Sequence, residues 1–110
     1  MMTEEQLIVK MEKEMPDNKR AGMMQALLQL EQRMGQTQSK PLYREVSAEV
    51  TKLYETLDRI LAKTVKALGY SPKMRQWDDT RPLDLMVRLF PELQQSQWYK
   101  LKMSYILAAD

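Results

Sequence analysis

Three aspartates in the second half of the chain are the residues whose types and spacing come nearest to catalytic or metal chemistry. Asp78 and Asp79 are adjacent, and Asp84 follows shortly after them. Paired carboxylates catalyse hydrolysis or bind Mg²⁺ when they converge across a cleft. Neighbouring positions on a chain do not produce that convergence. Asp79, or the following Thr80, is better explained as the cap of a helix.

The residue types that the chain lacks narrow the chemistry further. Its 110 residues include no Cys and no His. This excludes disulfides, thiolate nucleophiles and thiolate metal sites, and it removes the commonest general base. The sequence contains no P-loop, Rossmann glycine pattern or nucleophile elbow. We therefore expect a protein that is not an enzyme, with no catalytic residue, no metal site and no cofactor.

Basic side chains are concentrated in the second half of the chain. Up to Ile60 there are nine Lys or Arg and ten Asp or Glu, a net charge of −1; the remainder has eight and five, a net charge of +3. No acidic residue occurs between Asp58 and Asp78. Because basic side chains on one helix face can neutralise phosphates, this stretch predicts an alternative function, DNA or RNA binding. The candidate contacts are Arg59, Lys63, Lys66, Lys73 and Arg75.

Part of this stretch resembles a helix-turn-helix motif. Leu68–Gly69 followed by Tyr70–Ser71 is similar to the turn of that motif, where one helix ends in Leu-Gly and Ser caps the next. Val65 stands where the motif usually has Ala or Gly, and Arg75 where it has a buried aliphatic residue. The resemblance therefore assigns no base-contacting position. The net charge of +2 is also small for a dedicated DNA-binding protein.

Protein–protein interaction is the function that the composition favours. The chain has ten Met, five Tyr and two Trp, and aromatic, Met and Arg side chains are enriched at interfaces. The spacing of the methionines favours core filling, with a Met-lined partner groove as the alternative. We predict a small adaptor, inhibitor or accessory regulator that binds a protein partner through Tyr70, Arg75 and Trp77. A homodimer and a Trp77 folded back as a plug on the bundle are the open alternatives.

One long helix is predicted to position these residues. It runs from Leu42 to Leu68, is closed by Gly69, and has a length of roughly 40 Å at 1.5 Å per residue. Seven residues in it follow one another at steps of four and three, which places them on one helix face. They are Val46, Val50, Leu53, Leu57, Ile60, Thr64 and Ala67, and Tyr43, Tyr54, Leu61, Val65 and Leu68 widen the stripe.

Apolar periodicity and helix-ending residues predict the other elements. The expected helices are Thr3–Met15, with Thr3 and Gln6 as a capping box; Lys19–Met34, ended by Gly35; a turn over Pro72–Trp77; Pro82–Phe90; and one helix from Pro91 onward. The inward face of that last helix is expected to consist of Leu93, Trp98, Leu101, Tyr105 and Ala108. The short linker Gly35–Pro41 predicts an antiparallel hairpin of the two helices it joins.

These elements predict an all-α fold. We expect residues 1–110 to form a single α-helical domain, a small bundle of four principal helices plus one or two short helices along the central helix, residues 42–68. No apolar run is long enough to span a membrane. The first residues are acidic and amphipathic, unlike a secretory signal. A cytoplasmic protein with no membrane partner is therefore expected.

Overall fold

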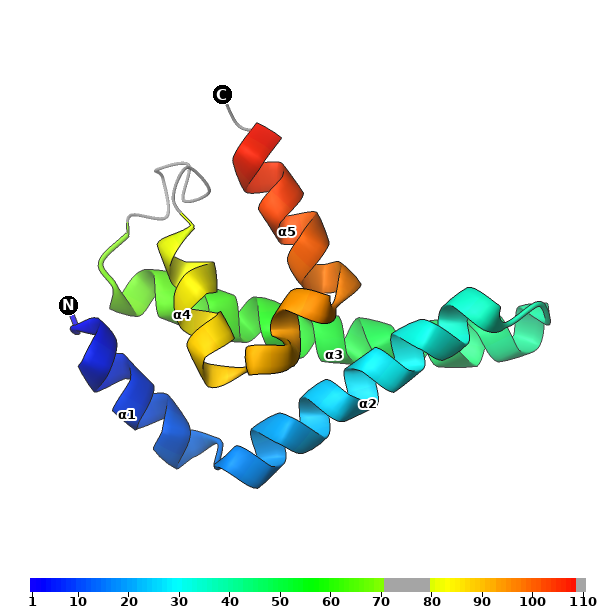
Figure 1. The fold of residues 1–110 in the computed structure, drawn as a ribbon, viewed down its shortest axis with the longest axis horizontal. Helices are drawn as coiled ribbons and strands as arrows, with labels where there is room; N and C mark the ends of the chain where they lie inside the picture. The colour runs from blue at the N-terminus through cyan, green and yellow to red at the C-terminus, as the bar shows by residue number, and fades with distance from the viewer. Residues whose placement is uncertain (71–79, 109–110) are drawn as a thin grey trace.

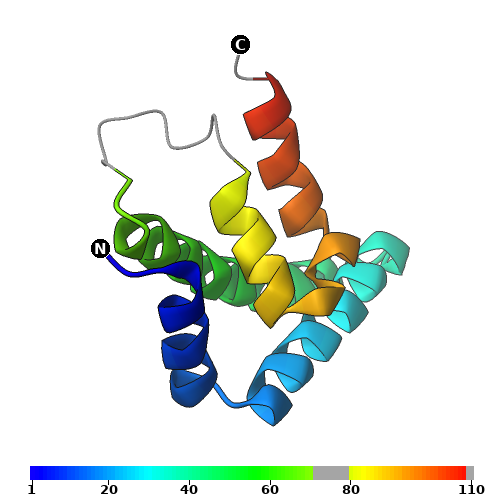
Figure 2. The same cartoon turned by 60° about the vertical axis from the view of Figure 1, so that its left-hand side comes forward.

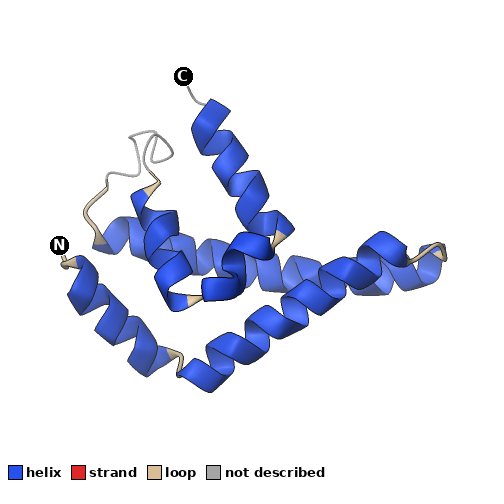
Figure 3. Ribbon diagram, viewed as in Figure 1, coloured by secondary structure: helices blue, strands red, loops and turns tan. Residues whose placement is uncertain are grey.

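The computed structural model describes residues 1–70 and 80–108. In these two ranges every regular element is helical, and Figure 3 shows no strand there. The all-α small bundle predicted from the sequence is confirmed. The elements are α1 (Glu4–Glu14), α2 (Asp17–Gln36), α3 (Lys40–Ala67), α4 (Arg81–Leu89), the 3-10 helix η2 (Pro91–Gln95) and α5 (Gln97–Ala108).

The long helix α3 crosses the whole molecule, and the other helices pack along it (Figure 1). Its 28 residues correspond to about 42 Å, in a molecule that measures 47 × 36 × 18 Å. The predicted inward stripe is confirmed: five of its seven residues are buried, and Leu53 and Ala67 are half-buried. The buried residues of α3 are Val46, Val50, Leu57, Ile60, Leu61, Thr64 and Val65.

The two ends of α3 differ from each other in how they are covered. Tyr43, predicted on the flank of the apolar stripe, is 45% exposed, and Leu42 beside it is 51% exposed. The prediction is wrong for Tyr43, because only α2 packs beside the first turns of α3, at the far end of the hairpin (Figure 1). The other flank residues, Tyr54, Leu61, Val65 and Leu68, are buried or half-buried. At the other end, Gly69 has a φ of +88°. Its N–H donates to Lys66 O at 3.0 Å, and Tyr70 N donates to Val65 O at 3.2 Å, which is the Schellman pattern that closes a helix.

The capping box predicted for the first helix is present. Thr3 Oγ1 accepts from Gln6 N at 3.1 Å, and Gln6 Oε1 accepts from Thr3 N at 3.1 Å. The end of α2 differs from the prediction: Gly35 lies inside the helix, which continues to Gln36. Thr37 ends it instead, because its hydroxyl and its N–H both donate to Arg33 O, at 2.7 and 2.9 Å. The loop that leads into α3 is correspondingly short, and α2 and α3 form the expected antiparallel hairpin (Figure 1).

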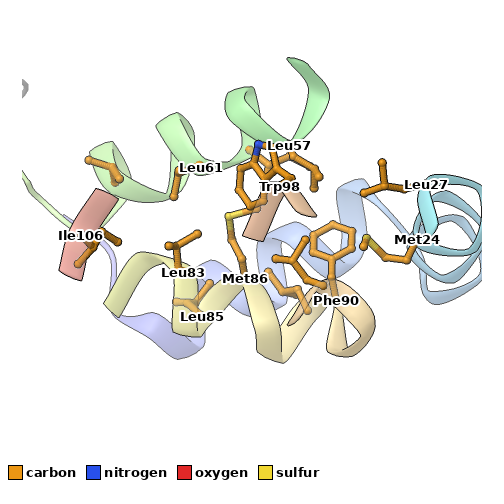
Figure 4. Close-up of a cluster of buried hydrophobic side chains, with 14 of the residues drawn as sticks. Met24, Leu27, Leu57, Leu61, Leu83, Leu85, Met86, Phe90, Trp98 and Ile106 are labelled. Atoms are coloured by element: carbon orange, nitrogen blue, oxygen red, sulfur yellow. The ribbon is translucent and has the colours of Figure 1, made fainter. Parts of the chain in front are cut away.

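Of the C-terminal elements, α4 packs against α1 and α3, η2 packs against α2, and α5 projects away from α3 (Figure 1). Thr80 precedes α4, close to the predicted start of this helix at Pro82. The prediction of a single last helix from Pro91 is wrong, because the helix is interrupted at Ser96, between η2 and α5. The buried Ser96 hydroxyl donates to Leu93 O at 2.7 Å and accepts from Tyr99 N at 3.0 Å, and so caps α5. Figure 4 shows the core that results, with side chains from α2, α3, α4 and α5 gathered in one cluster.

Helix α5 meets α3 along a stripe that the sequence pattern does not anticipate. Trp98 Nε1 donates to Asp58 Oδ1 at 2.9 Å, and Lys102 Nζ lies 3.0 Å from the same oxygen. Ile106, one turn further, is 8% exposed. Leu101 and Tyr105, which were predicted to face inward, are 54% and 63% exposed. Their placement was wrong because the inward positions of α5 follow one another at steps of four. The side chain of Ala108 lies outside the described residues.

Candidate partner-binding groove

An open groove separates α1 from the C-terminal half of α3. Figure 2 shows the start of α1 close to the C-terminal end of α3, at the end of the molecule where the N-terminus lies. The groove has a volume of about 680 Å³, within the range of about 300 to 1,000 Å³ that is usual for ligand pockets. Residues along the whole length of α1 line it, from Met2 just before the helix to Met15 just after it. The groove is therefore elongated.

The floor of the groove consists of apolar side chains from three separate segments. Leu7 of α1, Ile60 of α3 and Phe90 after α4 are 3%, 9% and 1% exposed. These side chains belong to the same buried cluster as the rest of the core. Because the floor is part of the core, it is a fixed surface on which a ligand could pack.

Methionines make up much of the groove walls. Met1, Met2, Met11 and Met15 all line it, and the last three are half-buried. The wall is joined to α3 at two points: Met2 N donates to Ala67 O at 2.9 Å, and Met11 Sδ lies 3.9 Å from Thr64 Oγ1. Met is unbranched and polarisable, and it adapts its shape to an apolar partner.

The rim of the groove is positively charged. Lys63 and Lys66 of α3 lie on one side, and Lys10 and Glu14 of α1 lie on the other. Lys10 Nζ is 4.0 Å from Glu14 Oε1, so these two charges largely offset each other at an exposed site. Among the described residues, neither Lys63 nor Lys66 has an acidic partner, and both are exposed. The net charge of the rim therefore comes from α3.

Arg20 closes one end of the groove, and it is a structural residue. Its side chain is 11% exposed. Nη1 donates to Met15 O at 2.6 Å, Nε donates to Leu89 O at 2.9 Å, and Nη2 pairs with the Asp17 carboxylate. The guanidinium thus satisfies carbonyl groups at the C-terminal ends of α1 and α4, where a positive charge is also favoured by the helix dipoles.

The candidate residues from the sequence are only partly brought together. Lys63 and Lys66 share the groove rim with α1. Arg59 lies one turn earlier on α3, outside the groove, and its Nη2 donates to Thr56 Oγ1 at 3.1 Å. Tyr70 is half-buried and packs against the core. The remaining candidates fall outside the described residues: Lys73, Arg75 and Trp77.

The aspartates that the sequence analysis considered for acid–base chemistry do not converge within the described part of the chain. Asp84 is exposed and accepts a hydrogen bond from Thr80 Oγ1 at 3.0 Å. Asp78 and Asp79 lie outside the described residues. Over residues 1–70 and 80–108, no three acidic side chains gather in a way that could hold a metal ion.

The sequence did not identify the α1 side of the groove. The spacing of the methionines favoured core filling, and Lys10 was given no role. Their shared position depends on how far α1 stands from α3, which is a tertiary property. The abundance of Met was the one available signal, since it left a Met-lined partner groove as the alternative to core filling.

Comparisons of the chain with protein families, with characterised proteins and with solved structures found no match. Within the described ranges, no helix is both long enough and apolar enough to cross a membrane.

Proposed function

We propose that this protein is a small non-enzymatic adaptor, inhibitor or accessory regulator that acts by binding a protein partner. The groove between α1 and α3 is the proposed binding site. We place the binding site in this groove and not at Tyr70, because Tyr70 packs against the core. In this proposal the methionines that line the groove take part in recognition as well as in packing.

One observation carries the proposal. The groove combines a buried apolar floor of Leu7, Ile60 and Phe90 with half-buried methionine walls and charged side chains on its rim. Protein interfaces have this composition: an apolar centre that excludes water, surrounded by a polar rim. Methionine-rich surfaces are also typical of proteins that bind other polypeptides.

Site-specific photo-crosslinking tests the proposal. The photoreactive amino acid p-benzoylphenylalanine would replace Met15 in the groove. As a control it would replace Lys100 on α5, which is exposed and does not line the groove. We expect irradiation of cells that produce the protein to give a discrete polypeptide adduct from position 15 and not from position 100. Mass spectrometry would identify the attached polypeptide.

Two results would contradict the proposal. One is the absence of any polypeptide adduct from position 15 in a variant that retains the helical circular dichroism of the native protein. The other is an adduct that nuclease treatment removes, since that would favour the nucleic-acid alternative. In that alternative Lys63 and Lys66 contact phosphates together with Arg59.

A further inference from the structure

We infer that the occupant of the α1–α3 groove is an acidic amphipathic helix from another protein. This inference rests on the proposed function and specifies the chemistry of the partner. Three observations lead to it. Two concern the groove, namely its shape and the charge of its rim. The third is the charge of α5, the helix of this chain that could occupy the groove of a second copy.

The shape of the groove favours a helix as the bound element. The groove follows α1, whose 11 residues correspond to about 16 Å, and it is bounded on the other side by α3. A helix that lies in a groove between two helices inserts apolar residues at positions i, i+3, i+4 and i+7. Methionine walls suit this mode because they can adjust to side chains of different shapes.

The charge of the rim selects an acidic partner. Lys63 and Lys66 are exposed and lack acidic partners within the described ranges. The charge of Lys10 on the opposite side is largely offset by Glu14, 4.0 Å away. Among the residues that the structure describes, Glu14 is the only acidic one that lines the groove. Glutamates or aspartates flanking the apolar stripe of a docked helix would lie next to these lysines. Complementary charges of this kind set partner choice and the rate of association.

The same charges disfavour α5 of a second copy as the occupant. Helix α5 has exposed apolar residues, Leu101, Tyr105 and Leu107, and is therefore the nearest alternative within this chain. However, α5 contains Lys100 and Lys102 and no acidic residue in its described range. Docking it in the groove would place like charges together, which costs binding energy.

Fluorescence anisotropy with synthetic peptides tests the inference. The probe is a labelled helical peptide of about 14 residues, or about 21 Å, with Leu on one face and Glu on both flanks. The matched control peptide keeps the same Leu face and has Lys in place of Glu. We expect the acidic peptide to bind at least about tenfold more tightly than the basic one, with a preference that shrinks between about 50 and 200 mM salt.

Two substitutions on α3 locate the binding site. Lys63→Glu changes a rim residue, and Arg59→Glu makes the same change in charge one turn outside the groove. Both side chains are exposed, so both variants should keep their helical circular dichroism. We expect Lys63→Glu to weaken binding of the acidic peptide about fivefold, and Arg59→Glu to weaken it less than about twofold, since charge effects fall off with distance.

Each remaining outcome overturns the inference. Equal binding of the two peptides would exclude an acidic preference, and equal effects of the two substitutions would place binding outside the groove. If neither peptide binds while the photo-crosslink from position 15 still captures a polypeptide, the partner chemistry is wrong and the proposed function stands. If the crosslink also fails, the proposed function fails with it.

Discussion

Arg20 joins the start of α2 to the end of α4, because its Nε donates to Leu89 O at 2.9 Å across 69 residues of sequence. The same guanidinium binds Met15 O at the end of α1. Three helices therefore meet at one side chain. The position of α1, and with it one wall of the groove, depends on this arrangement.

Arg20→Ala should lower the free energy of unfolding by about 2 to 4 kcal/mol, because two carbonyl groups lose charge-assisted hydrogen bonds in a site that is largely closed to water. Urea denaturation measures the change. Arg20→Lys should recover only part of the loss, since an ammonium group lacks the planar fork of donors. The neighbouring Lys19→Ala is the control, because Lys19 is exposed; an equal loss in both alanine variants would contradict the role given to Arg20.

Two glycines should respond in opposite directions to the same substitution. Gly69→Ala should lower the free energy of unfolding by about 1 to 2 kcal/mol, because a φ of +88° is unfavourable for a residue that carries a Cβ. Gly22→Ala, inside α2 with no atom near the added Cβ, should raise it by about 0.5 to 1 kcal/mol. Thermal and urea denaturation of the two variants would check the contrast, and a stabilising Gly69→Ala would exclude the left-handed helix end.

Tyr54 should make stability sensitive to alkaline pH. Burial of its phenol, its hydrogen bond to Glu31 and the nearby Glu31 charge raise the pKa of Tyr54 well above its usual value. In the unfolded chain the phenol ionises near pH 10, so the unfolded state loses its proton first. The stabilising contribution is therefore complete below about pH 10 and declines as the pH rises further.

The variant Tyr54→Phe isolates this effect. At neutral pH it should be less stable than the native protein by about 1 kcal/mol, the typical contribution of one hydrogen bond. The difference should shrink above about pH 10, because only the native protein carries the ionising phenol. Urea denaturation at a series of pH values would measure it, and a difference that stays constant up to about pH 11 would contradict the pKa assignment.

Local sequence signals predicted the helices well where the chain itself determines their ends. Thr3 and Gln6 form their capping box, and Gly69 adopts the left-handed conformation that ends α3. Gly35 was misleading, because a glycine ends a helix only where the following residues can form the closing hydrogen bonds. The hydroxyl of Thr37 takes that role instead.

Tertiary contacts explain the main errors in the last helix. Lys102 occupies an inward position on α5 because it forms an ion pair with Asp58 of α3. Trp98 donates a hydrogen bond to the same carboxylate. A prediction from hydrophobic periodicity places lysine on the surface. It therefore placed Leu101 and Tyr105 on the inward face. The groove escaped prediction for the same reason: its lysines and methionines come from helices that are neighbours only in the folded chain.

Methyl NMR of the methionines tests whether a helical peptide binds in the groove, since the side chains that line the groove report on it themselves. The protein would be labelled with ¹³C at the methionine methyl groups and titrated with the acidic helical peptide. We expect shifts for Met11 and Met15, with little change for Met34 and Met103, which are half-buried on α2 and α5 outside the groove. Shifts confined to Met34 or Met103, or none at Met11 and Met15 at saturating peptide, would contradict binding in the groove.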